Sequence, residues 1–292
     1  MRKVVCFGEI LWDVLPHGRF LGGAPLNVAY HLARLGCAPR LVSAVGRDAL
    51  GDEALAAIAR AGLGAESIAR HAHVPTGTVN VTLDAAGQAS YVIAEPVAWD
   101  EISVAPAPGV RPAALVFGSL ALRRPANRAA LRARLAAAPG LRVCDLNLRA
   151  PHDDLAPLAE FLGQLDVLKL NEAEARRLMP PALAAASVAT HAAHLAATLR
   201  CATVCITLGA DGALLRHGEK TFRASAPAVA VRDTIGAGDA FTAALLDGIL
   251  RARPQPDWPA LLVRAAALGA FVASRDGAQP GYVAEELFAA ST

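Results

Sequence analysis

Residues 233–239 carry the side chains best suited to chemistry. Two glycines, Gly236 and Gly238, stand just before Asp239, where an apolar run through Leu250 predicts a buried helix. Glycines can take positive φ angles and expose backbone N–H groups, and a helix N-terminus adds partial positive charge, so this loop is expected to bind an anion. A carboxylate there would act as the base for a hydroxyl that attacks a bound phosphoryl group. The alternative is an ordinary glycine loop in which Asp239 caps the helix.

A second glycine pair, Gly22 and Gly23, precedes another predicted helix, which carries Asn27 in its first turn. The exposed backbone donors and the amide of Asn27 would suit the hydroxyl groups of a sugar. Asp13, which follows the first predicted strand, could accept hydrogen bonds from two neighbouring hydroxyls. A glycine turn with Asn27 as a cap is the simpler structural alternative.

Asn171 and Glu174 lie three residues apart where a predicted strand turns into a helix, so both side chains can face the same way. They could hold Mg²⁺ through its water ligands, because this ion keeps much of its hydration. The structural alternative is a helix N-cap accompanied by a surface acid.

Two further polar clusters follow predicted strands. In the first, Arg149 could bind a phosphate or form a structural ion pair with Asp145. In the second, a nucleotide could lie flat against the backbone of Thr207, Gly209 and Gly212. Ligands bind at the carboxyl edge of an open α/β sheet, so all these clusters are expected to share that edge.

The elements that must position these residues alternate between strands and helices. Strands are predicted over residues 3–8, 41–45, 114–118, 141–146, 167–170 and 203–208. Besides the two helices that follow the glycine pairs, helices are predicted over residues 52–61, 125–138, 154–163, 172–178, 183–199 and 259–274. The alternation predicts an α/β fold of three layers, with a doubly wound, mostly parallel sheet between helices, and a hairpin over residues 213–224.

Residues 78–83 and 89–93 break this pattern. Polar and apolar side chains alternate there, and residues 84–87 would form the turn of a two-faced hairpin. We expect a single domain over residues 1–292, with a discontinuous β lid made of about residues 11–21 and 74–97. Outward apolar positions on the lid could support a homodimer, or could pack on their own domain in a monomer.

The composition argues against several classes of partner. The 28 basic and 26 acidic residues give a net charge of +2, without a basic tail or stripe that would bind nucleic acid. Residues 178–199 lack charged side chains, but their alanines, histidines and two prolines favour a soluble helix over a membrane span. The N-terminal apolar run is interrupted too early for a signal peptide. The five cysteines, four of them in predicted strands, are expected to be buried free thiols of a cytoplasmic protein.

Other common motifs are absent from the sequence. The glycine loop lacks the third glycine of a dinucleotide fingerprint, and residues 218–221 lack the spacing of a P-loop. His71 with His73, and His191 with His194, have no cysteine or carboxylate framework that would suggest zinc. We therefore expect these four histidines to lie mainly on the surface.

Taken together, the chain resembles the PfkB family of carbohydrate kinases, which have the ribokinase-like fold, over nearly its whole length. The motifs that carry the resemblance occur in order and are Gly22-Gly23 with Asn27, Asn171-x-x-Glu174 and Asp233-Thr234-Ile235-Gly236-Ala237-Gly238-Asp239. The resemblance implies that Asp239 is the base that deprotonates the sugar hydroxyl. It also implies that the anion hole for the transferred phosphoryl group is formed by Gly236, Ala237 and Gly238.

The resemblance implies binding roles for the remaining residues. The sugar would be bound by Asp13, Gly22, Gly23 and Asn27, with Arg149 as a further candidate. The ATP would be bound by Asn171, Thr207, Gly209, Gly212, Gly238 and Ala278, the last of these in the loop over residues 274–278. Mg²⁺ would be organised by Asn171 and Glu174, and K⁺ often lies near the residue equivalent to Asp233 in this family.

Two short stretches of sequence bear on the identity of the sugar. Residues 22–27 look like the fructokinase branch, so the expected reaction is ATP-dependent phosphorylation of a terminal hydroxyl of a hexose, with fructose first. The pattern Asp145-x-Asn147-x-Arg149 also appears in relatives that act on ketosugar acids, so a 2-keto-3-deoxygluconate kinase is the alternative, followed by a nucleoside kinase. A catalytically silent sugar-binding regulator is the alternative outside the enzymes. The intact base and glycines count against it, because a binder needs no base in an anion pocket.

Overall fold

A nine-stranded sheet forms the centre of the molecule. The computed structural model describes residues 1–15, 18–83, 89–105, 111–137, 140–252 and 255–289. The order of the strands in the central sheet is β13-β12-β11-β10-β9-β8-β1-β4-β5. Their bounds are β1 Lys3–Phe7, β4 Ala38–Gly46, β5 Ile68–His71, β8 Ala114–Phe117, β9 Leu141–Asp145, β10 Val167–Asn171, β11 Thr203–Thr207, β12 Ala213–His217 and β13 Lys220–Ala224.

All the pairings from β11 through β5 are parallel, and β12 and β13 are added antiparallel at one edge. The inner strands are short apolar runs that are buried almost throughout, as expected for strands covered on both faces. This arrangement confirms the mostly parallel sheet and the hairpin predicted over residues 213–224.

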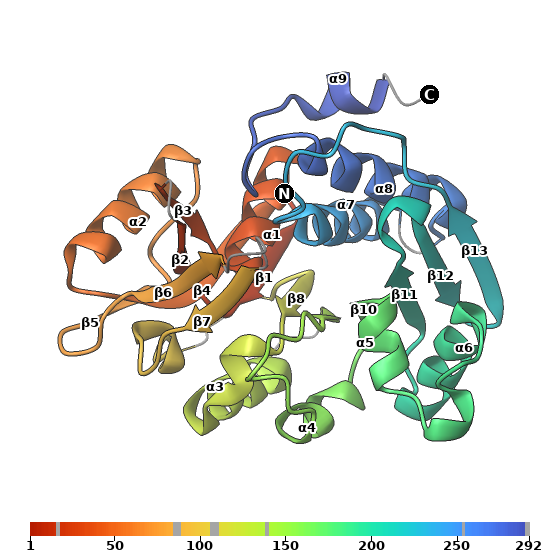
Figure 1. Ribbon diagram of the computed structural model, residues 1–292, viewed down its shortest axis with the longest axis horizontal. Helices are drawn as coiled ribbons and strands as arrows, with labels where there is room; N and C mark the ends of the chain where they lie inside the picture. The colour runs from red at the N-terminus through yellow and green to blue at the C-terminus, as the bar shows by residue number, and fades with distance from the viewer. Residues whose placement is uncertain (16–17, 84–88, 106–110, 138–139, 253–254, 290–292) are drawn as a thin grey trace.

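Helices cover both faces of this sheet (Figure 1) and make three layers. One face carries α1 Ala24–Arg34, α7 Ala237–Ala252 and α8 Trp258–Ala273. The other face carries α3 Pro125–Ala137, α4 Ala159–Leu162, α5 Glu172–Arg177 and α6 Val188–Leu199. Each face has its own hydrophobic core cluster, so the predicted three-layer α/β/α fold is confirmed.

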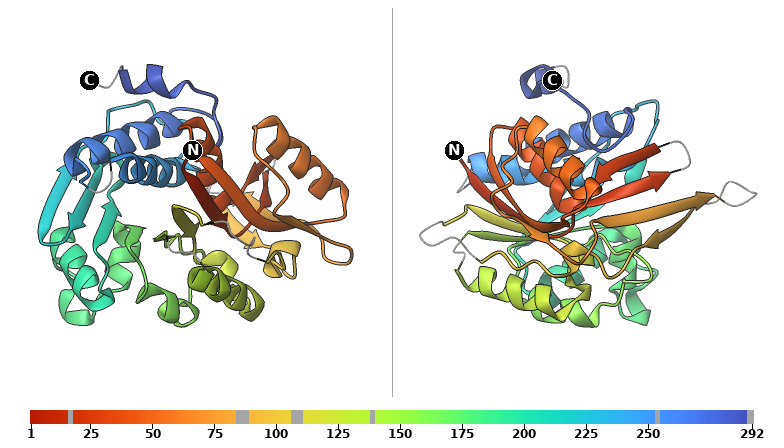
Figure 2. Two further views of the ribbon diagram at one scale, coloured as in Figure 1. Left: turned by 180° about the vertical axis from the view of Figure 1, so that it is seen from behind. Right: turned by 90° about the vertical axis from the view of Figure 1, so that its left-hand side faces the viewer.

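A second sheet of four strands stands beside the carboxyl end of β1 (Figure 2). Its strand order is β3 (Gly18–Gly22), β2 (Leu11–Leu15), β6 (Gly77–Leu83) and β7 (Ala89–Ile93). The antiparallel pairing of β6 and β7 confirms the predicted hairpin, whose turn at residues 84–87 lies outside the described residues. Helix α2, Ala49–Arg60, packs beside β2, because the indole of Trp12 donates a 3.0 Å hydrogen bond to Leu50 O.

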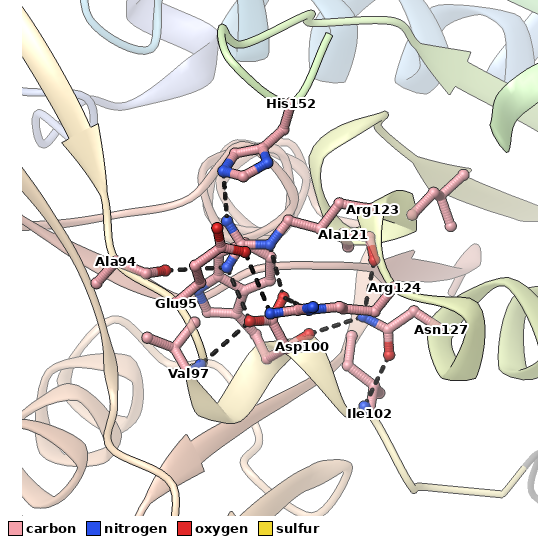
Figure 3. A network of polar contacts seen from close by, with 12 residues as sticks. Ala94, Glu95, Val97, Asp100, Ile102, Ala121, Arg123, Arg124, Asn127 and His152 are labelled. Carbon is pink, nitrogen blue, oxygen red and sulfur yellow. Dashed lines mark hydrogen bonds and ion pairs between the residues drawn. The ribbon is translucent and has the colours of Figure 1, made fainter. Parts of the chain in front are cut away.

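Arg123 connects the second sheet to the main body (Figure 3). Its guanidinium donates to both carboxylate oxygens of Asp100, at 2.6 and 2.8 Å, and to Ala94 O beyond the end of β7, at 2.9 Å. It also donates to His152 Nε2 at 3.0 Å and lies 4.1 Å from the ring centre of Trp99. An arginine can only donate, so His152 accepts at Nε2 and is neutral.

Several predicted boundaries are wrong. Residues 154–163 form a 3₁₀ turn, Ala156–Leu158, and the single turn of α4, in place of one longer helix. The helix predicted from residue 183 begins at Val188, because Ser187 caps it by accepting from Thr190 N. Residue 138, the predicted end of α3, lies outside the described part of the chain. The sequence also gave no indication of β5 or of α9, Ala284–Ala289.

The predictions for the cysteines and the histidines can also be compared with the structure. All five cysteines are buried free thiols, as expected, although three of them and not four lie within strands, namely Cys6, Cys144 and Cys205. The surface prediction is wrong for His191, which is 1% exposed and lies 2.9 Å from Leu183 O. Among the described residues, no helix is long and apolar enough to cross a membrane.

Candidate active site

The first turn of α7 builds one wall of the site. Gly236 has φ +77°, and a Cβ on it would lie 2.4 Å from the Cβ of Ala278, so both its conformation and its surroundings require glycine. This contact places the 233–239 loop against the loop that follows α8. Gly238 does not have a positive φ, so that part of the sequence argument is wrong. A Cβ on Gly238 would lie 3.0 Å from Lys169 Nζ, so a side chain there would push the ammonium away from this turn by a few tenths of an ångström.

Backbone amides are available at this helix end. The N–H of Ala237, which was predicted to be part of the anion hole, instead donates to Thr234 O at 3.3 Å, and that of Ala240 donates to Gly236 O. Within the described ranges, the N–H groups of Gly236, Gly238 and Asp239 have no hydrogen-bond acceptor. Unpaired amides at the N-terminus of a 16-residue helix attract an anion, because they combine hydrogen-bond donors with the positive end of the helix dipole.

Asp239 lies in the same turn and is held by helix α1. Its Oδ2 accepts a 2.8 Å hydrogen bond from Asn27 Nδ2, and Asn27 Oδ1 accepts from Gln279 Nε2 at 2.9 Å. The side chain keeps 9% exposure, and Oδ1 has no hydrogen-bond partner in the part of the chain that the structure describes. Burial, together with the charge of Asp145, raises the pKa of Asp239 to about 6. The carboxylate is therefore ionised at neutral pH with increased basicity, which suits a general base.

A buried ion pair lies next to Asp239. The Nζ of Lys169 is 3.0 and 3.1 Å from the two carboxylate oxygens of Asp145, and Thr242 Oγ1 donates to Asp145 Oδ2 at 2.7 Å. Burial lowers the pKa of Lys169, but the charge and hydrogen bonds of Asp145, together with the charges of Asp239 and Glu174, outweigh this effect and the pKa is raised. Asp145 thus pairs with Lys169, and the predicted alternative of an ion pair with Arg149 is wrong.

The predicted sugar residues meet around the start of α1. Gly23 has φ +113°, and a Cβ there would lie 2.4 Å from Glu9 O. A Cβ on Gly22 would lie 2.8 Å from Asp13 Oδ2, so the carboxylate of Asp13 is directly beside the glycine pair. Asn27, one turn along α1, joins this group to Asp239. Burial raises the pKa of Asp13 to about 6.

Glu9 is an additional buried acid, which the sequence placed with Asp13 after the first strand but without a role in the site. Its Oε1 accepts from Ala24 N at 3.2 Å at the start of α1, and its Oε2 is buried without a hydrogen-bond partner among the described residues. Burial raises the pKa of Glu9 to about 7, with a smaller contribution from the charge of Asp239. The residue therefore anchors the glycine pair and changes its protonation near neutral pH.

Arg149 lies within electrostatic range of this group. Its positive charge lowers the pKa of Glu9, Asp13 and Asp239, against the larger effect of burial on each. Its only described hydrogen bond is the 3.2 Å donation to Leu148 O, and the side chain is exposed. An exposed cation near three acids is placed to meet an anionic substrate group.

Asn171 and Glu174 form a complete capping box at the start of α5. Asn171 Oδ1 accepts from Glu174 N at 2.9 Å, and Glu174 Oε2 accepts from Asn171 N at 2.8 Å. Glu174 Oε1 accepts from Leu148 N at 2.7 Å. Glu174 is 6% exposed, so the alternative of a surface acid is wrong, and burial raises its pKa. Each oxygen retains a lone pair that could accept a hydrogen bond from a metal-bound water, which fits indirect Mg²⁺ binding.

Asp233 joins the two loops that flank α7 and α8. Its Oδ1 accepts from Ile235 N at 2.9 Å and its Oδ2 accepts from Gly277 N at 3.2 Å. Ala278 follows directly and contacts Gly236. No group of three or more His, Cys, Asp and Glu side chains with a geometry suited to a metal occurs within the described ranges. Any ion here would therefore rely on backbone oxygens, waters or substrate oxygens.

The predicted nucleotide turn follows β11. Gly209 and Gly212 have φ +60° and +89°, and a Cβ on Gly212 would lie 2.0 Å from Ala224 O. Thr207 Oγ1 donates weakly to Leu170 O at 3.4 Å. A cavity of about 400 Å³ opens beside this turn, and it is lined by Glu172, Val188, Leu208, Asp211, Arg223, Ala224 and Ser225.

The structure thus brings the predicted residues from both ends of the chain to one edge of the sheet. Sequence reasoning missed Lys169, Thr242 and Gln279 as site residues. The one available signal was Lys169, a charged residue within an otherwise apolar strand. Gln279 and Thr242 carried no signal, because their partners are 252 and 97 residues away.

Comparisons with known proteins agree with this geometry. A family model described as pfkB family carbohydrate kinase matches residues 1–284. Aminoimidazole riboside kinase of Salmonella typhimurium is 32% identical over 86% of this chain and 82% of its own, and fructokinase of Klebsiella pneumoniae is 32% identical over 85% and 84%. The crystal structure of fructokinase from Vibrio cholerae with fructose, ADP and calcium bound has a TM-score of 0.84 at 26% identity and covers 99% of this chain and 98% of its own. The resemblance drawn from the motifs and the ribokinase-like fold are confirmed.

Proposed function

Because this chain belongs to the pfkB family of carbohydrate kinases, we propose that it transfers the γ-phosphoryl group of ATP to a terminal hydroxyl of a hexose, with fructose as the first candidate. The observation that carries the proposal is the position of Asp239. Its carboxylate is ionised at neutral pH and lies in the same helical turn as three unpaired backbone amides. A base and an anion site within one turn suit transfer of a phosphoryl group to a hydroxyl.

The reaction then requires three changes in bonding. Asp239 accepts the proton of the sugar hydroxyl, and that hydroxyl oxygen forms a bond to the γ-phosphorus. The bond from the γ-phosphorus to the oxygen bridging the β- and γ-phosphates breaks, and its electron pair stays on ADP. The N–H groups of Gly236 and Gly238 stabilise the charge on the phosphoryl oxygens during transfer. Asn27 holds Asp239 towards the sugar, and Asp13 with Gly22 and Gly23 binds the other hydroxyls.

Two ions fit the residues present. Asn171 and Glu174 would hold Mg²⁺ through waters, and the ion would offset the charge of the ATP phosphates when bound. Asp233, at the junction of the two loops, would favour K⁺ nearby. The ATP would bind along Thr207, Gly209 and Gly212, and the 400 Å³ cavity beside them supports this location.

A second candidate substrate follows from the comparisons. Aminoimidazole riboside kinase is as similar to this chain as fructokinase, at 32% identity each, so a ribosyl nucleoside is the second candidate. A 2-keto-3-deoxy sugar acid is the third, and the exposed charge of Arg149 near the sugar residues supports a carboxylate-bearing substrate.

The test is a coupled assay of ATP consumption over fructose, other hexoses, aminoimidazole riboside and 2-keto-3-deoxygluconate. We expect the highest kcat/KM with fructose. A higher value with the riboside or the sugar acid would reassign the substrate. Sugar binding without ADP formation would contradict the kinase proposal and favour a regulatory sugar-binding protein.

The second sheet is proposed to act as a lid on a single domain. Its strands β2 and β3 carry Asp13 and Gly22, so movement of the sheet would open or close the sugar site and exclude water. Val92 on β7 is 59% exposed and could contribute to a homodimer through the lid. Hydrogen exchange should show increased protection of β6 and β7 when the sugar binds. Equal protection with and without sugar would contradict the lid.

A further inference from the structure

Lys169 is the one lysine that the structure buries beside the catalytic turn, among the described residues. The residue is 7% exposed and lies in β10, two positions before Asn171. An ammonium inside a sheet loses its hydration, and a buried ion pair seldom recovers all of that cost by its own attraction. A stability role therefore explains this lysine poorly.

The position of the ammonium relative to Gly238 is informative. A Cβ on Gly238 would lie only 3.0 Å from Lys169 Nζ, so the ammonium lies against the backbone of the first turn of α7. Gly238 does not need a glycine for its backbone conformation, because its φ is not positive. The missing side chain instead leaves room for Nζ.

The electrostatics of this placement favour an anion. The N-terminus of α7 already carries partial positive charge and unpaired N–H groups, and a neighbouring ammonium adds a full charge. The carboxylates of Asp145 and Asp239 offset part of this positive charge. Asp145 compensates on one side of Nζ, and the phosphoryl group would compensate on the other.

The ammonium also has spare hydrogen-bonding capacity. It has three N–H donors, and within the described ranges its acceptors are the two oxygens of Asp145. At least one donor is therefore free for a ligand. Asp145 is fixed in turn by Thr242 Oγ1, which lies 2.7 Å from its Oδ2 and 3.0 Å from Gly238 O. Thr242 thus ties the ion pair to the same helical turn as the anion site.

We propose that Lys169 is a further catalytic residue, which donates a hydrogen bond to the transferred phosphoryl group, and that Asp145 and Thr242 are positioning residues that hold its ammonium beside Gly238. This inference rests on the proposed phosphoryl transfer. Lys169 keeps its proton and forms no covalent bond during the step. Its charge stabilises the phosphoryl oxygens while the bond to the sugar oxygen forms and the bond to ADP breaks.

The experiment compares wild-type protein with Lys169→Met in two measurements. The first is binding, by calorimetry, of ADP with aluminium fluoride, Mg²⁺ and the sugar with the highest kcat/KM, a complex that imitates the phosphoryl group in flight. The second is binding of ADP and of the sugar separately. We expect the Kd of the complex to rise about 10²- to 10³-fold, and kcat to fall by a similar factor, while the separate Kd values change less than about threefold.

Two further variants keep the test decisive. Because Lys169→Met leaves Asp145 buried and unpaired, the double variant Lys169→Met/Asp145→Asn removes both charges and restores stability. It should show the same loss of complex binding. Arg142→Met, which breaks the ion pair with Asp166 at the amino ends of β9 and β10, the two strands that carry Asp145 and Lys169, is the matched control and should bind the complex like wild type. A folded single or double variant that binds the complex like wild type would overturn the role of Lys169. A wild-type protein that transfers no phosphoryl group to any sugar would instead overturn the proposed function and this inference together.

Discussion

Two buried ion pairs in this protein look alike but differ in how their charges are used. Lys169 and Asp145 have 8% and 5% exposed side chains, and Arg123 and Asp100 have 6% each, so burial does not distinguish the pairs. Arg123 donates to Asp100, to Ala94 O and to His152, and it lies over the ring of Trp99 (Figure 3). Lys169 donates to Asp145 alone among the described residues.

The difference teaches how a structural pair can be told from a functional one. A buried cation whose donors are nearly all used fixes the parts of the chain that it joins, here the second sheet, the 3₁₀ turn at residues 98–100 and the loop of His152. A buried cation with a free donor beside an anion site is incomplete until a ligand arrives. Loss of the Arg123 pair should therefore lower stability, and loss of the Lys169 pair should lower turnover.

The largest effect on stability is expected from Arg123→Met. Removing Arg123 leaves the buried Asp100 with only the longer 3.6 Å ion pair to Arg124, and breaking a buried pair costs about 3–5 kcal/mol of unfolding free energy. Urea denaturation would measure this loss, and kcat of the folded fraction should stay within about threefold of wild type. A large loss of kcat in a variant that keeps its stability would break the comparison between the two pairs.

The next effect is the pH dependence of kcat/KM, which tests the site beside the Lys169–Asp145 pair. Asp239 must be ionised to accept a proton, so kcat/KM should fall about tenfold per pH unit below its pKa of about 6. Burial raises this pKa most, followed by the charge of Asp145, whereas the hydrogen bond from Asn27 and the charges of Lys169 and Arg149 lower it. Glu9→Gln serves as the control, because it removes the other nearby acid and should keep the acid limb. Activity that is constant between pH 4.5 and pH 8 would contradict the role of Asp239.

Much of this site was predictable from local sequence. The glycine pairs, Asp239 and the capping box of Asn171 with Glu174 depend on neighbours within a few residues, so their chemistry is visible in order along the chain. The alternation of buried strands and helices likewise predicted the layers. Helix ends at residues 154–163 and 183–188 were less predictable, since 3₁₀ turns and a serine cap compete with the helical pattern there.

The remaining contacts of the site could not be predicted, because they join residues that are far apart in the sequence. Asn27 reaches Asp239 over 212 residues, and Lys169 pairs with Asp145 across two neighbouring strands. The wrong expectation of an Arg149–Asp145 pair arose because both residues are close in sequence, whereas the strand directs Asp145 to Lys169. The order of the strands in the sheet decides which side chains become neighbours, and this order cannot be read from the local sequence.

A smaller effect should appear in the stability of Asp239→Asn. The pKa of Asp239 is raised from 3.8 to about 6 in the folded protein, so the folded state binds this proton more tightly than the unfolded state. The cost of burying the charge is thus absent below pH 3.8, grows as the pH rises, and is complete above pH 6. Asp239→Asn should raise Tm by a few degrees (about 2–4 °C per kcal/mol) at pH 8 and leave it unchanged at pH 3.5. An equal change at both pH values would contradict this burial cost.

The smallest effect is expected from Gln279→Ala. It removes one hydrogen bond to Asn27 and leaves the bond from Asn27 to Asp239, so the loss should be about 0.5–1.5 kcal/mol, seen as a severalfold fall in kcat/KM. Gln279→Glu is a matched variant that keeps the length of the side chain but removes the amide donor. A fall in kcat/KM as large as that of Lys169→Met would contradict the expectation that Gln279 contributes much less to the site than Lys169.

The most direct measurement is the rate of phosphoryl transfer by Asp239→Asn in a single turnover with saturating ATP and sugar. If Asp239 takes the proton of the sugar hydroxyl, the rate falls by about 10²- to 10⁴-fold while the Kd of the sugar stays close to that of wild type. A rate within threefold of wild type would contradict the role of Asp239 as the base.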